Sequence, residues 1–286
     1  MEVRRLTGSR YDELKGFLPI QVKQDLYALH VAGKNTNWRQ YQDLDSAKMK
    51  RVNRANLLNA RQVPSLANFA DEFIFVSGGQ DPKWESFLSS VHKYDIQNDS
   101  WSRAPALSKP RVGHASCTLN DMIYVFCGGV VNPDDNDDIG EPNPDNSIEF
   151  LNARALINGT AQVTWQLVQL AEPNSSPLSA RFLPVVAPLN STEIVILGGD
   201  SSIEGANLLL GDMLIFDIES GTIRPVPINN DSSENNSELK FQSSSNISVS
   251  TKVDEIAALV MDSHGKLHLL SYTKGCDKVQ IVERLV

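Results

Sequence analysis

The sequence predicts an all-β fold built from a repeated unit of four short antiparallel strands. Three segments share one pattern, in which an arginine stands seventeen positions before the first glycine of a Gly-Gly pair. Each pair follows a run of β-branched and aromatic residues that is too short for a helix and apolar enough for a strand buried on both faces. The segments begin at Arg61, Arg111 and Arg181, and their glycine pairs are Gly78 and Gly79, Gly128 and Gly129, and Gly198 and Gly199.

The first two runs of each segment are expected to form a hairpin. The turn between them contains Asn, Asp or Ser, which tolerate left-handed or self-hydrogen-bonded backbone. The glycine pair suits the end of the second strand, because glycine adopts positive φ and lets a neighbouring backbone approach where a Cβ would clash. The predicted inner hairpins are residues 66–78, 115–127 and 185–197.

Two further runs follow each glycine pair. The third run carries an aromatic residue and the fourth a tryptophan, except that Ile223 replaces the tryptophan in the last copy. Four antiparallel strands per unit form one blade of a β-propeller. Large flat rings are expected to fill the wedge between twisted neighbouring blades. The aromatic residues assigned to third strands are Tyr27, Tyr94, Phe150 and Phe216, and the tryptophans assigned to fourth strands are Trp38, Trp101 and Trp165.

The repeat extends to both ends of the chain, so residues 1–286 are expected to form a single propeller domain with about five blades. The first blade is predicted to be incomplete, with Thr7 and Gly8 in place of the glycine pair and no inner strand. The last blade is also predicted to be incomplete and has no glycine pair. The predicted blades are approximately residues 1–44, 62–107, 111–170, 181–228 and 247–286.

A Gly-Gly pair, then an aromatic residue, then a tryptophan, in units of about 50 residues, resembles the kelch repeat. The second and third units match it closely, the fourth in part, and the first and fifth weakly. The resemblance implies a propeller whose loops bind other proteins, and we predict that this chain is such an interaction module and not an enzyme. Two alternatives stay open: a propeller enzyme similar to galactose oxidase, and a fragment of a larger kelch scaffold or ubiquitin-ligase adaptor.

Blade topology predicts which side of the propeller binds a partner. The connection from the second to the third strand and the connection to the next blade emerge on one side, here called the long-loop face. The other two connections emerge on the opposite side, the turn face. Most long insertions fall on the long-loop face, where loops on a rigid scaffold concentrate binding residues. The partner-binding candidates are Arg61, Arg111 and Arg181, for which pairing with backbone or carboxylates is an equally open alternative.

The chain offers weak candidates for metal chemistry. His114, Cys117 and Cys127 are expected close together, as a copper-radical site would need, but no carboxylate or second histidine stands nearby, so buried thiols are favoured. The acidic segment 133–145 has Ile139 where an EF-hand needs glycine, which favours a solvated loop. We therefore predict no catalytic residue, metal or cofactor.

Charge favours a protein partner over nucleic acid or an anionic membrane. The chain carries 26 basic and 35 acidic residues, a net charge of -9, which repels a phosphate backbone. The one basic stretch, residues 48–61, is expected in a loop or short helix. Three cysteines without CxxC spacing and the lack of a signal-like apolar segment predict a cytoplasmic protein. Seven N-x-S/T sequons are mostly attributed to chance in a chain rich in Asn and Ser.

Overall fold

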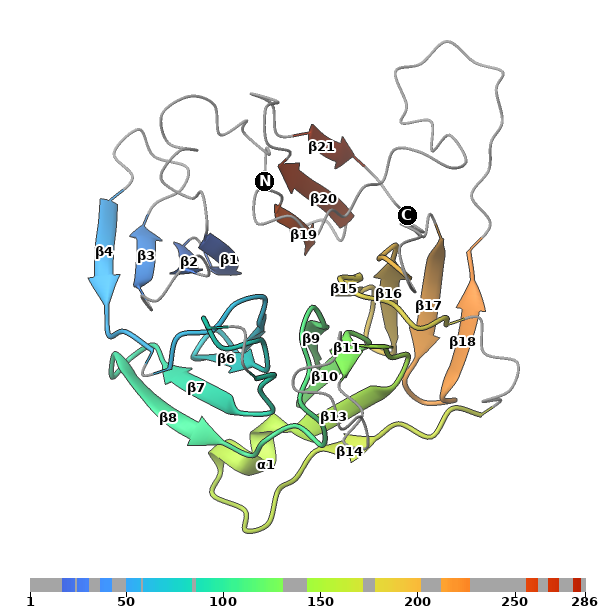
Figure 1. The fold of residues 1–286 in the computed structure, drawn as a ribbon, viewed down its shortest axis with the longest axis horizontal. Helices are drawn as coiled ribbons and strands as arrows, with labels where there is room; N and C mark the ends of the chain where they lie inside the picture. Colours follow the sequence, from blue (N-terminus) through green and yellow to red (C-terminus); the bar gives the residue numbers. More distant parts are fainter. Residues whose placement is uncertain are drawn as a thin grey trace.

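The strands of the protein are arranged as separate sheets around a common axis, which is the architecture of a β-propeller (Figure 1). Four sheets have four antiparallel strands, and a fifth has three among the described residues. The innermost strands of successive sheets contact one another from β1 to β5, β9, β15 and β19. The computed structural model describes residues 17–23, 25–30, 37–42, 50–57, 59–83, 86–130, 143–171, 178–201, 212–226, 256–261, 267–272 and 280–283.

Each sheet uses strands in their order along the chain, from the axis outward. The first sheet contains β1 (Phe17–Val22), β2 (Asp25–His30), β3 (Trp38–Gln42) and β4 (Lys50–Arg54), and the second contains β5 (Ser65–Phe69), β6 (Phe73–Ser77), β7 (Val91–Asp95) and β8 (Ser100–Ala104). The third contains β9 (Ala115–Leu119), β10 (Met122–Phe126), β13 (Ile148–Asn152) and β14 (Gln166–Leu167), and the fourth contains β15 (Val185–Pro188), β16 (Glu193–Leu197), β17 (Met213–Asp217) and β18 (Thr222–Pro225). The fifth contains β19 (Ile256–Met261), β20 (Leu267–Tyr272) and β21 (Gln280–Glu283), while β11 (Gly129–Val130) and β12 (Asn143–Pro144) form a separate ribbon.

The all-β prediction is confirmed, and the three inner hairpins lie where the sequence placed them. The strands of these hairpins are β5 with β6, β9 with β10, and β15 with β16. The helix α1 (Ala153–Ile157) lies in the connection between β13 and β14, with Asn152 as its N-cap. It is the only helix among the described residues and, with five residues, is far too short to cross a membrane.

The first sheet differs from the prediction because it is complete. Residues 17–22 form the inner strand β1, which was predicted to be missing, and pair with β2. Tyr27 therefore lies on the second strand and Trp38 on the third, one strand earlier than predicted. The error arose because this sheet has no glycine pair after its second strand to set the strand count. The predicted strand with Thr7 and Gly8 lies outside the described residues.

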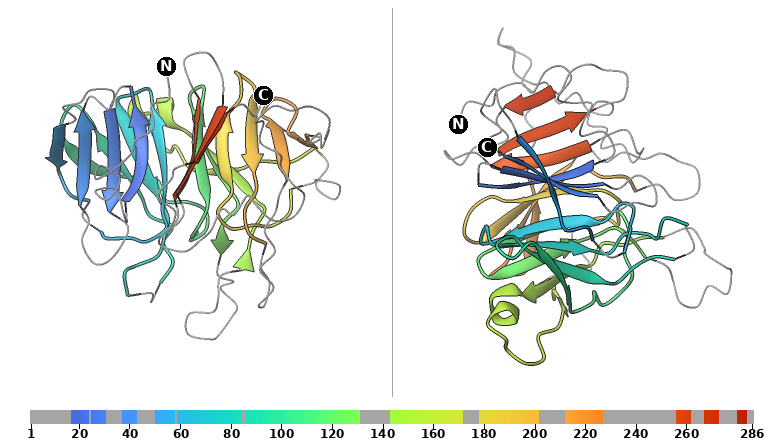
Figure 2. Two further views of the ribbon diagram at one scale, coloured as in Figure 1. Left: turned by 90° about the horizontal axis from the view of Figure 1, so that it is seen from above. Right: turned by 90° about the vertical axis from the view of Figure 1, so that its left-hand side faces the viewer.

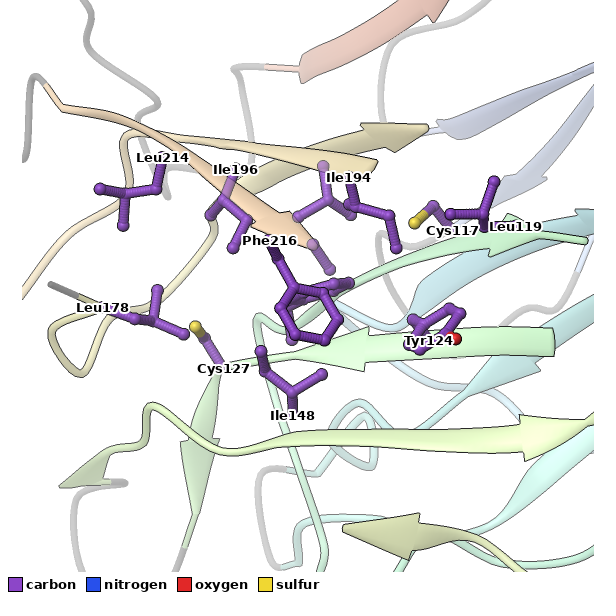
Figure 3. Packing of buried hydrophobic residues seen from close by; sticks show 13 residues of the cluster. Cys117, Leu119, Tyr124, Cys127, Ile148, Leu178, Ile194, Ile196, Leu214 and Phe216 are labelled. Carbon is purple, nitrogen blue, oxygen red and sulfur yellow. The ribbon is translucent and has the colours of Figure 1, made fainter. Parts of the chain in front are cut away.

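The core lies between neighbouring sheets. Inner strands contribute small residues such as Ala67 and Cys117, and aromatic rings from the following strands pack in the same gaps. Between the third and fourth sheets, Tyr124 and Phe126 of β10 contact Phe216 of β17, with ring centroids 6.2 and 6.0 Å apart (Figure 3). This packing confirms the predicted role of Phe216 between blades.

Four rings fill the gap between the first and second sheets. Tyr27 and Trp38 pack against Tyr94 and Trp101, and the centroids of Trp38 and Trp101 are 5.5 Å apart. Tyr27 and Trp38 thus have the predicted packing role, although their strands were predicted wrongly.

Phe150 lies on the predicted strand but on the opposite face of its sheet. Ile74, Ile123 and Ile194 hold equivalent places on the second strands of their sheets. Ile74 pairs with Tyr94 and Ile194 pairs with Phe216, but Ile123 pairs with Leu151. A shift of one residue along a strand reverses the face that a side chain occupies. Leu151 therefore fills the gap toward the preceding sheet, and the half-buried Phe150 packs toward the next one.

Candidate functional site

The three arginines of the repeat stand just before the inner strands, at the long-loop face. Their positions were predicted, but their side chains do not project into solvent: Arg61 is 2% exposed, and Arg111 and Arg181 are 0% exposed. Long side chains of this type are almost never fully buried unless each charge is paired or hydrogen-bonded. The contacts of the guanidinium groups therefore decide what these residues do.

Each guanidinium donates a hydrogen bond to the carbonyl oxygen of the residue that follows the second strand of its own sheet. That residue has a left-handed backbone in every case, with φ between 54° and 58°. The side chain thus spans from the start of the first strand to the end of the second and closes the hairpin at its open end. The Nη1-to-oxygen distances are 3.1 Å from Arg61 to Gly78, 2.7 Å from Arg111 to Cys127 and 2.9 Å from Arg181 to Gly198.

Cys127, and not Gly128, holds the first position of the glycine pair in the third sheet. The turn of this hairpin, Asn120 and Asp121, is one residue shorter than the turn at 70–72. The arginine-to-glycine spacing is equal in both segments, so in the third sheet the glycine pair lies one residue further from the end of the second strand. Cys127 accordingly has φ 58°, in the region that Gly78 and Gly198 occupy, and Gly128 matches Gly79. Gly129, predicted as part of the pair, begins the β11 ribbon instead.

In the second and third blades, the second residue of the pair connects neighbouring blades. The amide N–H of Gly79 donates to the carbonyl oxygen of Arg111 at 2.7 Å, and that of Gly128 donates to the carbonyl oxygen of Arg181 at 2.9 Å. Glycine is required because an added Cβ would meet backbone of the adjoining loop, for example the oxygen of Gln62 at 2.6 Å from a Cβ on Gly79. The arginine and glycine signature therefore joins strand to strand and blade to blade.

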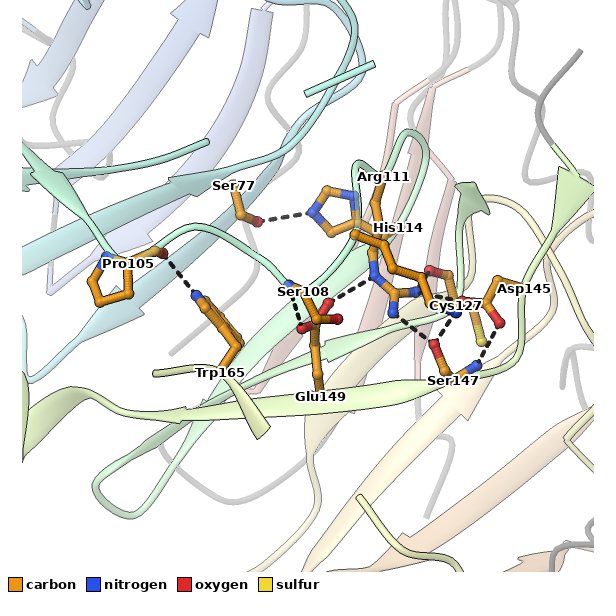
Figure 4. Close-up of polar contacts among 11 residues, drawn as sticks. Ser77, Pro105, Ser108, Arg111, His114, Cys127, Asp145, Ser147, Glu149 and Trp165 are labelled. Carbon is orange, nitrogen blue, oxygen red and sulfur yellow. Dashed lines mark hydrogen bonds and ion pairs between the residues drawn. The ribbon is translucent and has the colours of Figure 1, made fainter. Parts of the chain in front are cut away.

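Arg111 makes the most extensive set of charged contacts (Figure 4). Its Nε lies 2.9 Å from Oε1 of Glu149, and both side chains are fully buried. Its Nη1 lies 3.1 Å from Oδ2 of Asp145, and its Nη2 donates to the hydroxyl of Ser147 at 2.6 Å. The pKa of Asp145 is lowered even though burial opposes this, because Ser147 and Arg111 stabilise its carboxylate. The last residue of the acidic segment thus has a structural role, while residues 131–142 lie outside the described part of the chain.

Arg181 and Arg61 differ from Arg111 in their counterions. Arg181 contacts both carboxylate oxygens of Asp212, at 2.7 and 2.9 Å. Arg61 contacts Ser90 and the Nδ1 of His92, the latter at 2.9 Å, and no carboxylate among the described residues. Burial without a counterion lowers the pKa of Arg61 to about 10.

The arginines are therefore internal braces, which is the structural alternative stated for them. Their guanidinium groups have no exposed surface with which to meet a partner, so the expectation that they ring the binding face as accessible contacts is wrong. The reason is local: the end of the second strand and the start of the third supply carbonyl, hydroxyl and carboxylate acceptors beside each arginine, which lies shortly before the first strand.

A buried serine and histidine pair, which sequence reasoning did not identify, lies between the second and third sheets. The Oγ of Ser77 is 2.8 Å from Nε2 of His114, while Nδ1 of His114 is buried with no partner (Figure 4). When the imidazole proton is on Nε2, this nitrogen donates to Ser77. Nδ1 then carries no hydrogen, so no buried N–H lacks an acceptor. Burial and the nearby arginines lower the pKa of His114 to about 3. In this arrangement the imidazole donates to the serine and does not accept its proton, so the pair lacks the property of a nucleophile and base.

The thiols do not form a metal site with His114. Cys117 and Cys127 are free and buried, and burial raises the pKa of both. Within the described ranges, no group of three or more histidine, cysteine or carboxylate side chains could hold a metal ion. Both cysteines pack as apolar side chains between the third and fourth sheets (Figure 3).

Two tryptophans brace the outer edges of successive blades. The indole N–H of Trp101 donates to the carbonyl oxygen of Ala55 at 2.7 Å, and that of Trp165 donates to that of Pro105 at 2.9 Å. Ala55 and Pro105 each follow the outermost strand of the preceding sheet. Besides these bonds, both rings pack in the apolar clusters between neighbouring sheets.

Acid should destabilise the protein through His92 and His114, the two buried histidines in the described part of the chain. His92, held neutral by the donated bond from Arg61, has its pKa lowered from 6.5 to about 4, chiefly by burial. The unfolded chain binds protons below pH 6.5 at sites where the native chain does not, so stability is lost as pH falls from about 6.5 toward 4. The urea midpoint should fall between pH 7 and pH 5 and vary less in a His92→Gln and His114→Gln double variant. An unchanged wild-type midpoint over this range would contradict the assignment.

Comparison with known proteins agrees with this architecture. A family model described as the kelch motif matches residues 71–108, the segment that contains Gly78, Gly79, Tyr94 and Trp101. The resemblance inferred from the repeat is thereby confirmed, and the fold and motif define a kelch-type β-propeller. Among solved structures, the chain is similar to the structure of YjhT, with a TM-score of 0.60, 15% sequence identity, and coverage of 90% of this chain and 72% of that one. A comparison with curated proteins gave no match.

Proposed function

We propose that this kelch propeller is a non-enzymatic module that binds a protein partner through its long-loop face. The observation that carries the proposal is the unequal length of the connections on the two faces. On the turn face, β5 and β6 are joined by residues 70–72, and β17 and β18 by residues 218–221, with the connection of residues 153–165 between β13 and β14 as the exception. On the long-loop face, β6 is joined to β7 by residues 78–90, and the β11–β12 ribbon projects from the body (Figure 2).

At least one long loop is held in a defined shape. Gln80 pairs with Phe87 across the loop, and the amide of Asp81 donates to the oxygen of Ser86 at 3.0 Å. The carboxylate of Asp81 accepts from the amide of Lys83 and the hydroxyl of Ser86, both at 2.9 Å. A loop that is ordered before binding loses less conformational entropy when a partner docks, which suits a recognition surface.

The non-enzymatic part of the proposal draws on the contacts of the polar side chains just described. The guanidinium groups of the three arginines make internal hydrogen bonds, and the imidazole of His114 donates a hydrogen bond to Ser77. A reducing, cytoplasmic location belongs to the same proposal and is supported by the two free, buried thiols Cys117 and Cys127.

Charge reversal on exposed residues tests the binding face without disturbing the braces. Lys83→Glu, on the long-loop face, should weaken capture of a specific partner by about tenfold or more, because reversing a charge at a binding surface sets like charges against each other. Glu72→Lys and Glu219→Lys, exposed on the turn face, serve as matched controls and should leave capture unchanged. Cross-linking and quantitative mass spectrometry of the captured complex would measure both. Loss of capture by the turn-face pair alone would contradict the proposal.

A further inference from the structure

The three brace arginines occupy equivalent places, which makes their surroundings directly comparable. The amides of Gly78, Cys127 and Gly198 donate to the carbonyl oxygens of Ser90, Ser147 and Asp212, respectively, so these three acceptors are equivalent. By the same register, His92, which pairs with Val76, is equivalent to Glu149, which pairs with Val125. The second blade therefore presents a serine and a histidine where the third presents a serine and a glutamate.

Arg61 lacks the counterion that its equivalents have. Arg111 faces Glu149 and Asp145, and Arg181 faces Asp212. At the place equivalent to Asp145 the second blade has Leu88, since Leu88 and Asp145 make the same backbone bonds to Gly79 and Gly128. The charged groups that act on His92 are both cations, Arg61 itself and Arg103 of β8, which pairs with His92.

One donor of Arg61 is also unused. Its terminal nitrogens contact Gly78, Ser90 and His92, but its Nε is buried and has no acceptor among the described residues. In the third blade the equivalent Nε donates to Glu149, and in the fourth it donates to the carbonyl oxygen of Ser179 at 3.0 Å. A buried N–H without an acceptor beside an uncompensated positive charge is unusual in a native structure and points to an unrecorded acceptor.

We propose that a small monovalent anion, a halide or a formate-sized carboxylate, binds beside the Nε of Arg61 and makes the contact that the Glu149 carboxylate makes with the Nε of Arg111. Such an anion supplies the missing acceptor and the missing negative charge together. The closed surroundings of Arg61, which is 2% exposed, favour an ion of the size of chloride and disfavour a large organic anion. This site is independent of the proposed partner-binding face, because the ion stabilises the body of the propeller.

Thermal unfolding in matched salts tests the site. Wild-type protein titrated with sodium chloride or bromide at constant ionic strength, with sodium gluconate as the replaced salt, should show a saturable rise in Tm of about 2–4 °C. An Arg224→Gln variant, changed at an exposed arginine, should keep this response. Equal melting temperatures of the wild type in chloride and gluconate would overturn the proposal.

A variant that supplies the carboxylate covalently separates the site from general salt effects. His92→Glu copies the Glu149 position and should raise Tm in gluconate while abolishing the response to chloride. If that variant fails to fold, crystals of the wild type soaked in bromide provide the second readout, through an anomalous peak within hydrogen-bond distance of the Nε of Arg61. No peak at that position, or a chloride response that persists in folded His92→Glu, would overturn the proposal.

Discussion

Replacing Arg111 with methionine should lower the free energy of unfolding by about 3–5 kcal/mol, among the largest effects expected of any single change in this chain. The substitution keeps the length of the apolar part of the side chain but leaves the carboxylate of Glu149, which is fully buried, without its partner. It also removes the donors to the carbonyl oxygen of Cys127 and to Ser147. Equilibrium unfolding in urea measures the loss.

Two further variants show whether the lost charge pair is the cause. Arg224→Met breaks an ion pair with Glu193 whose arginine is 56% exposed, and exposed pairs contribute about 1 kcal/mol or less. Combining Arg111→Met with Glu149→Leu removes both buried charges and should recover part of the stability. If Arg111→Met were no more destabilising than Arg224→Met, the arginine would not be a brace.

Gly128→Ala should destabilise the protein by about 2–5 kcal/mol, from backbone strain and overpacking together. Gly128 has φ 92°, and a Cβ there would lie 2.7 Å from the Cβ of His114 and 2.9 Å from the carbonyl oxygen of Val112. These atoms belong to the loop that leads into the inner strand β9. Because the oxygen of Val112 is a backbone atom, turning a flexible side chain cannot relieve the clash.

Gly159 provides a matched control for this substitution. It also has positive φ, 75°, but no atom lies within 4 Å of the place of its Cβ. Gly159→Ala should therefore cost about 1 kcal/mol, the conformational term alone. Thermal and urea unfolding of the two variants give the comparison, and equal losses would show that the close approach of the Val112 and His114 loop to Gly128 is unimportant.

The repeat itself could be predicted from the sequence because its signals are local. A short apolar run, a polar turn and a glycine pair each report on a few neighbouring residues, and their recurrence identified the inner hairpins and the kelch resemblance. The first sheet was misassigned for the complementary reason: without a glycine pair, nothing local distinguishes Tyr27 on a second strand from Tyr94 on a third.

The role of the arginines could not be settled from sequence because burial depends on residues that lie far along the chain. Arg111 is separated by 38 residues from Glu149, its buried counterion. Cys127 was overlooked for a different reason, since a hairpin turn shortened by one residue moved it into a left-handed position that sequence favours for glycine. Both cases depend on which residues of neighbouring strands lie opposite each other, and the periodicity of the sequence does not reveal this.

Amide hydrogen exchange at Gly79 and Gly128 is the most direct test of the central claim that the repeat signature fastens each blade to the next. Both amides donate to the main chain of the neighbouring blade, to Arg111 and Arg181. If these links hold in solution, the two amides should exchange only through global unfolding, as slowly as the central-strand amides of Ile74 and Val125. Exchange as fast as that of Gly159, in its exposed turn, would contradict the account.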